Sequence, residues 1–143
     1  LFNRFFQSDI DVMDEKMVFS NSYSNRGDYK HAIRYSGLAS ERINGDICAS
    51  GGIYSGMDAL KTIMAGASAF QTVSSLYKNG LGNIKTILEE LNKLADSKGV
   101  TSLEDLRGNM AKGNLSDPFA FTRTQYIKML NEPEPLEEVD PRP

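Results

Sequence analysis

The chain has 143 residues, about the length of one domain, with a formal net charge of −3 and a pI near 5.2. This acidic balance gives no electrostatic support for a nucleic-acid partner. The single cysteine, Cys48, excludes an internal disulfide, and one cysteine with one histidine is too few ligands for a zinc site. The sequence contains no long apolar run and no signal-peptide pattern, and we expect a cytoplasmic protein.

The first part of the chain has mixed polarity. Residues 1–3 have the pattern of a strand end. Ile10, Val12 and residues 17–19 indicate short extended pieces in a long excursion after that strand. The serine- and asparagine-rich stretch over 20–25 predicts a loop.

A helix is predicted over 29–42, where apolar residues gather on one side. A buried strand is predicted over 46–50, and Gly51 and Gly52 follow it directly. Cys48 lies inside this strand pattern, so a small packed thiol is its expected state.

A second strand-to-helix unit follows the first. Ser55 and Asp58 have the spacing of a capping box that opens a helix ending at Gly66. A strand over 69–73 and a long helix over 81–97 come next. The apolar positions expected to be buried by the first of these helices are Ala59, Leu60, Ile63 and Met64. Repeated strand–helix alternation predicts an α/β fold with a parallel sheet.

The last part of the chain is predicted to form short helices. Thr101 and Glu104 have capping-box spacing for a short helix. Asp117, followed by a proline, predicts the start of a helix that continues to about residue 130. The acidic, proline-rich residues 132–143 are predicted to be a disordered tail, which leaves 1–131 as the folded domain.

The two strand ends predict an anion site. A strand that ends in Gly51 and Gly52 exposes main-chain N–H groups without side chains in the way. A helix N-terminus beside each strand end adds partial positive charge. If the strands are parallel neighbours, these ends converge on one anion, and phosphate sites of this kind recur in (β/α)₈ barrels. Taken alone, the glycine pair also fits a tight strand-to-helix turn.

A set of short motifs resembles a known family. The carrying residues are Ala49-Ser50-Gly51-Gly52-Ile53, Gly56-x-Asp58-Ala59, Ala65-Gly66-Ala67, Gln71-x-x-Ser74-x-Leu76, Gly80 and Ser102-Leu103-x-Asp105-Leu106-Arg107-Gly108, together with the opening stretch over 2–11. In this order they resemble the C-terminal end of the dihydroorotate dehydrogenases, flavin-dependent (β/α)₈ barrels of pyrimidine synthesis. Because a complete barrel takes about 250 residues, the resemblance implies the C-terminal part of a TIM barrel, with C-terminal helices, whose N-terminal half is missing from the chain.

The resemblance also implies a cofactor and site residues. Main-chain N–H groups of Gly51, Gly52 and Val73, with the hydroxyl and N–H of Ser74, would hold the phosphate of FMN. Asn3 would contact the pyrimidine substrate, since an amide both donates and accepts hydrogen bonds. The family often has glycine at the position of Val73. Two further departures are an arginine directly after Asn3 and the absence of a glycine-rich stretch around residues 25–27.

The activity implied by the resemblance is oxidation of dihydroorotate to orotate. The family's catalytic base and flavin lysine lie on earlier strands, so this chain would contain no catalytic residue and no metal site, and we expect no turnover by it alone. Fumarate, a nicotinamide partner and a quinone remain open as electron acceptors, as does a homodimer.

Two alternatives remain. One is a degenerate barrel segment that binds a phosphorylated ligand without chemistry, and the other is a flavin oxidoreductase with a different small substrate. Other reactive residue types have simpler interpretations. His31 is expected to be solvated on a helix surface, the carboxylates of Glu89 and Glu90 to be solvated, and the stretch over 108–113 to be a connection.

Overall fold

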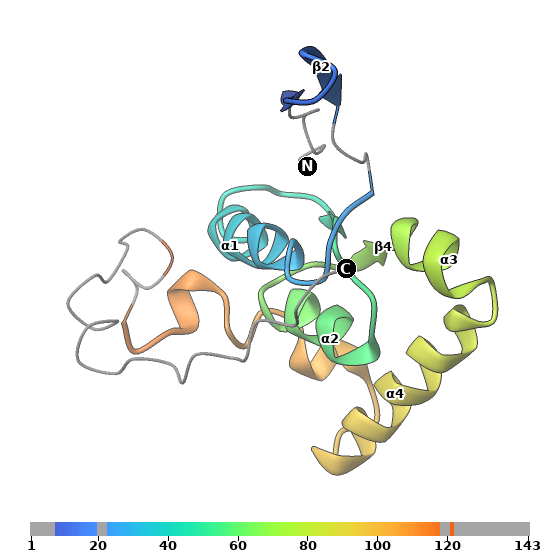
Figure 1. Cartoon of the computed structure of the whole chain (residues 1–143). Coiled ribbons are helices and arrows are strands. Elements are labelled where there is room, and N and C mark those ends of the chain that lie inside the picture. The colour runs from blue at the N-terminus through green and yellow to red at the C-terminus, as the bar shows by residue number, and fades with distance from the viewer. Residues whose placement is uncertain (1–7, 20–22, 118–120, 122–143) are drawn as a thin grey trace, which may run out of the picture.

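The computed structural model describes residues 8–19, 23–117 and 121 (Figure 1). Several sequence predictions lie outside these residues: the strand end at 1–3 with Asn3, most of the helix expected after Asp117, and the tail over 132–143.

An antiparallel hairpin forms the first described part of the chain. Strands β1 (Ser8–Asp11) and β2 (Lys16–Phe19) pair along their whole lengths. They correspond to the short extended pieces predicted there. The hairpin stands away from the other elements in Figure 1 and leaves large apolar side chains such as Met13 and Phe19 exposed.

Helix α1 (Tyr29–Ala39) ends three residues before its predicted end. The main-chain N–H groups of Arg42 and Ile43 both bond to the carbonyl of Ala39, which closes the helix in a turn. Gly37 is buried on this helix because the ring of Phe121 lies against it; a Cβ there would stand 2.6 Å from the Phe121 Cζ.

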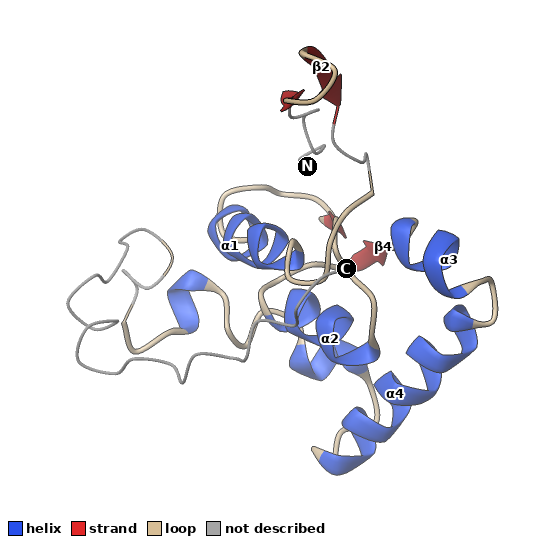
Figure 2. Cartoon of the chain, in the orientation of Figure 1, coloured by secondary structure: helices blue, strands red, loops and turns tan. Residues whose placement is uncertain are grey.

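Strands β3 (Cys48–Ser50) and β4 (Ala69–Gln71) form the parallel pair that the strand–helix alternation predicts. Both are shorter than predicted. After β3 the chain turns through Gly51 and Gly52, which have positive φ angles. After β4, Val73 leaves the extended conformation. The structure is therefore a mixed α/β arrangement with one parallel strand pair (Figure 2).

The two faces of β3 differ in burial, which overturns the prediction for Cys48. Ala49 is buried in the core, whereas the Cys48 side chain is exposed. Successive side chains of a strand point to opposite faces, and the packed helices cover the Ala49 face. Cys48 therefore points away from the core.

Helix α2 (Gly56–Met64) connects the two strands and packs mainly on helix α4 (Asn83–Ser97). Gly56 permits the close approach, since a Cβ there would stand 2.8 Å from the carbonyl oxygen of Ile87. Met64 is only partly buried, unlike the other apolar positions predicted for α2. The buried residues that form the core are Ile47, Ala49, Ile53, Ala59, Leu60, Ala67, Ile87, Leu91 and Leu106.

Helix α3 (Ser74–Asn79) links β4 to α4. The apolar side chains of α4 are only partly covered. Ile87 and Leu91 are buried, but Ile84 is 45% exposed and Leu88 is 52% exposed. Gly99 follows α4 with a φ of +67°, as expected for a glycine that ends a helix.

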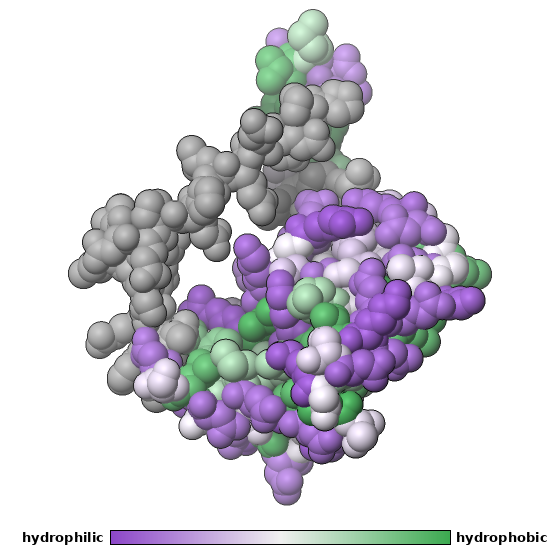
Figure 3. Space-filling model, turned by 90° about the horizontal axis from the view of Figure 1, so that it is seen from below, coloured by the Kyte–Doolittle hydropathy of each residue, from purple (hydrophilic) through white to green (hydrophobic). Residues whose placement is uncertain are grey.

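Two short 3₁₀ helices, η1 (Leu103–Leu106) and η2 (Lys112–Asn114), complete the described chain. The cap of η1 is one residue from its predicted position: the Ser102 hydroxyl oxygen accepts from the Glu104 N–H at 3.1 Å, and Thr101 is not the cap. Within 8–19 and 23–117, no helix has both the length and the apolar character needed to cross a bilayer. On the face that Figure 3 shows, hydrophobic residues reach the surface in several places between hydrophilic ones.

Candidate functional site

The carboxyl ends of β3 and β4 lie side by side. The last paired residues are Ser50 and Gln71, so the chain leaves both strands at the same edge of the pair. Gly51 and Gly52 follow one strand, while Val73 and Ser74 follow the other after one intervening residue. The Thr72 hydroxyl ties the two exits together by donating to the Ile53 carbonyl at 2.8 Å.

Gly51 and Gly52 have different surroundings. Both have positive φ, +101° and +66°. No atom lies within 4 Å of the place where a Gly51 Cβ would stand, so its backbone is open to approach. A Cβ on Gly52 would stand 2.6 Å from the Asn25 carbonyl oxygen and 2.7 Å from the Tyr29 nitrogen. Gly52 is therefore required where the chain packs under the loop before α1.

Val73 and Ser74 lie where β4 gives way to α3. Val73 is 50% exposed, and Ser74 is the first, half-buried residue of the helix. The Ser74 hydroxyl oxygen accepts from the main-chain N–H of Ser24 at 2.9 Å. Because a serine hydroxyl donates as well as accepts, its proton is still available to an anion.

The loop before α1 closes onto these strand ends. Ser24 is held at both main-chain polar groups, since its carbonyl accepts from the Tyr54 hydroxyl at 2.5 Å. The N–H of Asn25 bonds to the Asp28 carboxylate at 2.8 Å, which fixes the turn into α1. The sequence predicts a loop here but contains no local signal for its docking on residues fifty positions away.

Two cations lie beside the same aromatic ring. Tyr54 is 5% exposed; the Arg26 guanidinium carbon lies 5.5 Å from its ring centroid and the Lys78 ammonium nitrogen 5.7 Å from it. Such distances are typical of cation–π contacts. The sequence contains no local signal for this grouping, because the three residues come from separate parts of the chain.

The start of α2 is capped twice. The Ser55–Asp58 capping box is present, as predicted: the Ser55 hydroxyl oxygen accepts from the Asp58 N–H, and the Asp58 carboxylate accepts from the Ser55 N–H. The Glu90 carboxylate on α4 also accepts from the Gly56 N–H at 2.6 Å. The prediction that Glu90 is solvated is therefore wrong, while Glu89 is exposed. His31 is exposed on α1, as predicted.

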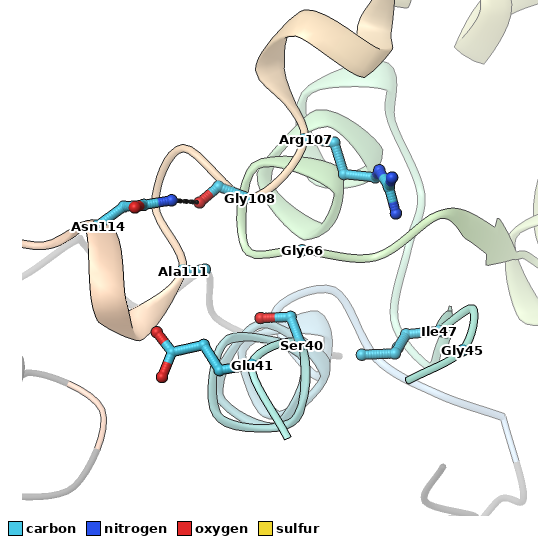
Figure 4. Close-up of a pocket in the computed structure, with 9 residues that line it drawn as sticks. All are labelled: Ser40, Glu41, Gly45, Ile47, Gly66, Arg107, Gly108, Ala111 and Asn114. Atoms are coloured by element: carbon cyan, nitrogen blue, oxygen red, sulfur yellow. Dashed lines mark hydrogen bonds between the residues drawn. The ribbon is translucent and has the colours of Figure 1, made fainter. Parts of the chain in front are cut away.

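A pocket of about 270 Å³ lies at the opposite ends of the strands (Figure 4). Ile47 and Gly66, which line it, precede β3 and β4 in the chain. The Arg107 side chain at its rim is engaged by Glu104 and by the Ser68 hydroxyl. The Ser40 hydroxyl oxygen is buried and has no partner among the described residues. In parallel α/β folds ligands bind at the carboxyl ends of strands, so this pocket is not the candidate site.

Comparison with known proteins finds a family match over the segment that carries the strand ends. The family model for dihydroorotate dehydrogenase matches residues 33–95. This part of the chain is similar to the dihydroorotate dehydrogenase family. The match includes β3, β4 and the helices that follow them, and therefore all four residues predicted to hold phosphate.

Individual relatives and solved structures show the same similarity. A probable dihydroorotate dehydrogenase A (fumarate) of Streptococcus pneumoniae is 38% identical over 106 residues, which cover 69% of the chain and 34% of that protein. A dihydroorotate dehydrogenase (fumarate) of Lachancea kluyveri is 39% identical over 64 residues, or 45% of the chain and 20% of that protein. The chain thus spans about a third or less of the length of these curated relatives.

The crystal structure of ligand-free dihydroorotate dehydrogenase from Eimeria tenella is similar in fold. Its TM-score is 0.56 at 31% sequence identity, over 59% of the chain and 24% of that protein. A structure of the same enzyme in complex with ferulenol matches with a TM-score of 0.55.

Proposed function

We propose that the protein is an FMN-dependent oxidoreductase of the dihydroorotate dehydrogenase type, which oxidises dihydroorotate to orotate in pyrimidine synthesis. The observation that carries this proposal is the pair of adjacent parallel strand ends at Gly51 and Ser74, inside the segment that matches the family. In this proposal residues 1–131 are the C-terminal segment of a (β/α)₈ barrel, and the enzyme is cytoplasmic.

The residues at the strand ends fit a phosphate group. Gly51 leaves its backbone open, and the Ser74 hydroxyl retains a proton to donate while it accepts from Ser24. Val73 is half exposed, so the side chain that replaces the family's frequent glycine does not bury the strand end. Gly52 contributes by allowing the loop over 25–29 to close on the turn. A bound flavin supplies the redox chemistry, and the protein positions it.

The remaining assignments extend the same proposal. Asn3 contacts the pyrimidine ring of the substrate, and the catalytic base comes from a part of the barrel that precedes this chain. The enzyme forms a homodimer in this proposal. Its electron acceptor is fumarate, a nicotinamide partner or a quinone.

The test is the flavin content of the purified protein and its response to substrate. The proposal predicts a yellow protein that releases FMN on denaturation and shows a flavin spectral shift on titration with orotate. A colourless protein that takes up no FMN would contradict the flavin site. A flavin that ignores orotate would contradict the substrate assignment.

A second candidate function is binding of a phosphorylated ligand without chemistry. Two departures from the family pattern favour it: the arginine directly after Asn3 and the absence of a glycine-rich stretch around residues 25–27. Reduction of bound FMN by dihydroorotate in the protein that carries the complete barrel would exclude this alternative.

A further inference from the structure

We propose that Arg26 and Lys78 form the cationic side-chain part of the phosphate site, an inference that rests on the proposed flavin function. The ligand class is a phosphomonoester dianion, such as the tail of FMN. Both cations lie beside the Tyr54 ring, at 5.5 Å and 5.7 Å from its centroid.

The connections of the main chain bring both cations to the carboxyl ends of the strands. Arg26 lies two residues after Ser24, whose N–H bonds to the Ser74 hydroxyl. Lys78 lies four residues after Ser74 on α3, and residues four apart share one face of a helix. Tyr54 lies two residues after Gly52 and donates its hydroxyl proton to the Ser24 carbonyl.

Within the described ranges, neither the Arg26 guanidinium nor the Lys78 ammonium forms an ion pair. Both charges are therefore available to an anion, in a chain whose net charge is −3.

Cationic side chains strengthen a phosphate site built from main-chain N–H groups. Main-chain N–H groups offer only partial positive charge, whereas a phosphomonoester carries nearly two negative charges at neutral pH. A guanidinium and an ammonium supply the missing charge as hydrogen-bond donors. The competing explanation is that both cations only cover the Tyr54 ring, as a stabilising contact without a ligand.

Titration of the protein that carries the complete barrel with FMN and with riboflavin, which lacks the phosphate, separates these explanations. The variants are Arg26→Gln, Lys78→Gln and the double substitution, with Lys93→Gln on the exposed surface of α4 as the matched control. We expect each single substitution to weaken FMN affinity about tenfold, as for loss of a charge-assisted hydrogen bond. The double variant should weaken it further, with riboflavin affinity unchanged and Lys93→Gln like the wild type.

Each other outcome overturns a stated claim. FMN affinity that survives the double substitution contradicts the role of the two cations but leaves the flavin site standing. Equal losses for FMN and riboflavin show a structural role for the cations and also contradict the inference. Failure of the wild type to bind FMN contradicts the proposed function itself and the inference with it.

Discussion

The main-chain N–H of Ser24 donates a hydrogen bond of 2.9 Å to the hydroxyl oxygen of Ser74, fifty residues further along the chain. This contact holds the loop before α1 against the strand end where we propose the phosphate site. It also orients the Ser74 hydroxyl, whose proton is directed away from the group that donates to it.

Substitution Ser74→Ala removes both functions of this hydroxyl. The free energy of unfolding should fall by about 1 kcal/mol for the lost bond to Ser24, and FMN affinity should fall more than riboflavin affinity. Ser97→Ala is the control, because Ser97 bonds only locally to the Leu94 carbonyl at the exposed end of α4. Parallel calorimetric titrations measure both affinities, and an FMN affinity equal to that of the wild type would remove Ser74 from the site.

Substitution by alanine should lower the unfolding free energy by different amounts at the two glycines after β3. Gly52→Ala places a Cβ against the Asn25 carbonyl and the Tyr29 nitrogen, so we expect unfolding free energy to fall by about 2 kcal/mol or more. The Cβ added by Gly51→Ala meets no atom. This substitution should therefore lower the unfolding free energy by backbone strain alone, about 1 kcal/mol. Urea denaturation compares the two variants. Equal destabilisation would contradict the different packing described for the two glycines.

The Glu90 carboxylate should stabilise the packing of α2 on α4. Glu90→Ala leaves the Gly56 N–H without its partner, and loss of a hydrogen bond to a charged group costs about 2 kcal/mol. Glu89→Ala, one residue earlier, removes an exposed carboxylate that forms an ion pair with Lys85 and should change stability by less than about 0.5 kcal/mol. Thermal denaturation followed by circular dichroism distinguishes them, and the account fails if the Glu89 variant is the less stable of the two.

Two leucines on α4 test which side of the helix is packed. Leu91→Ala removes a buried side chain and should cost about 2–5 kcal/mol. Leu88→Ala, on the half-exposed side, should cost less than about 1 kcal/mol. The same denaturation measurement applies to both, and a comparable loss at Leu88 would show that this side is covered in solution.

Local signals in the sequence predict much of this fold. The Ser55–Asp58 box opens α2, and the strand–helix alternation predicts the parallel pairing of β3 with β4. Each depends on residues close together in the chain, where spacing and backbone preference are sufficient.

The predictions that failed depend on contacts between distant segments. Cys48 is exposed because only one face of β3 is covered by helices, and Glu90 is engaged because α4 packs on the start of α2. The approach of Arg26 and Lys78 to Tyr54 arises in the same way. No periodic pattern encodes such contacts, and they determine most of the chemistry of the candidate site.

The most direct test follows the assigned amide resonances of the ¹⁵N-labelled protein during titration with FMN and, separately, with riboflavin. Main-chain amides that grip a phosphate should shift only with the phosphorylated flavin. We expect the signals of Gly51 and Ser74 to move with FMN and to stay in place with riboflavin. Shifts confined to the pocket at Gly66 and Gly108, or identical shifts with both flavins, would contradict phosphate binding at the carboxyl ends of β3 and β4.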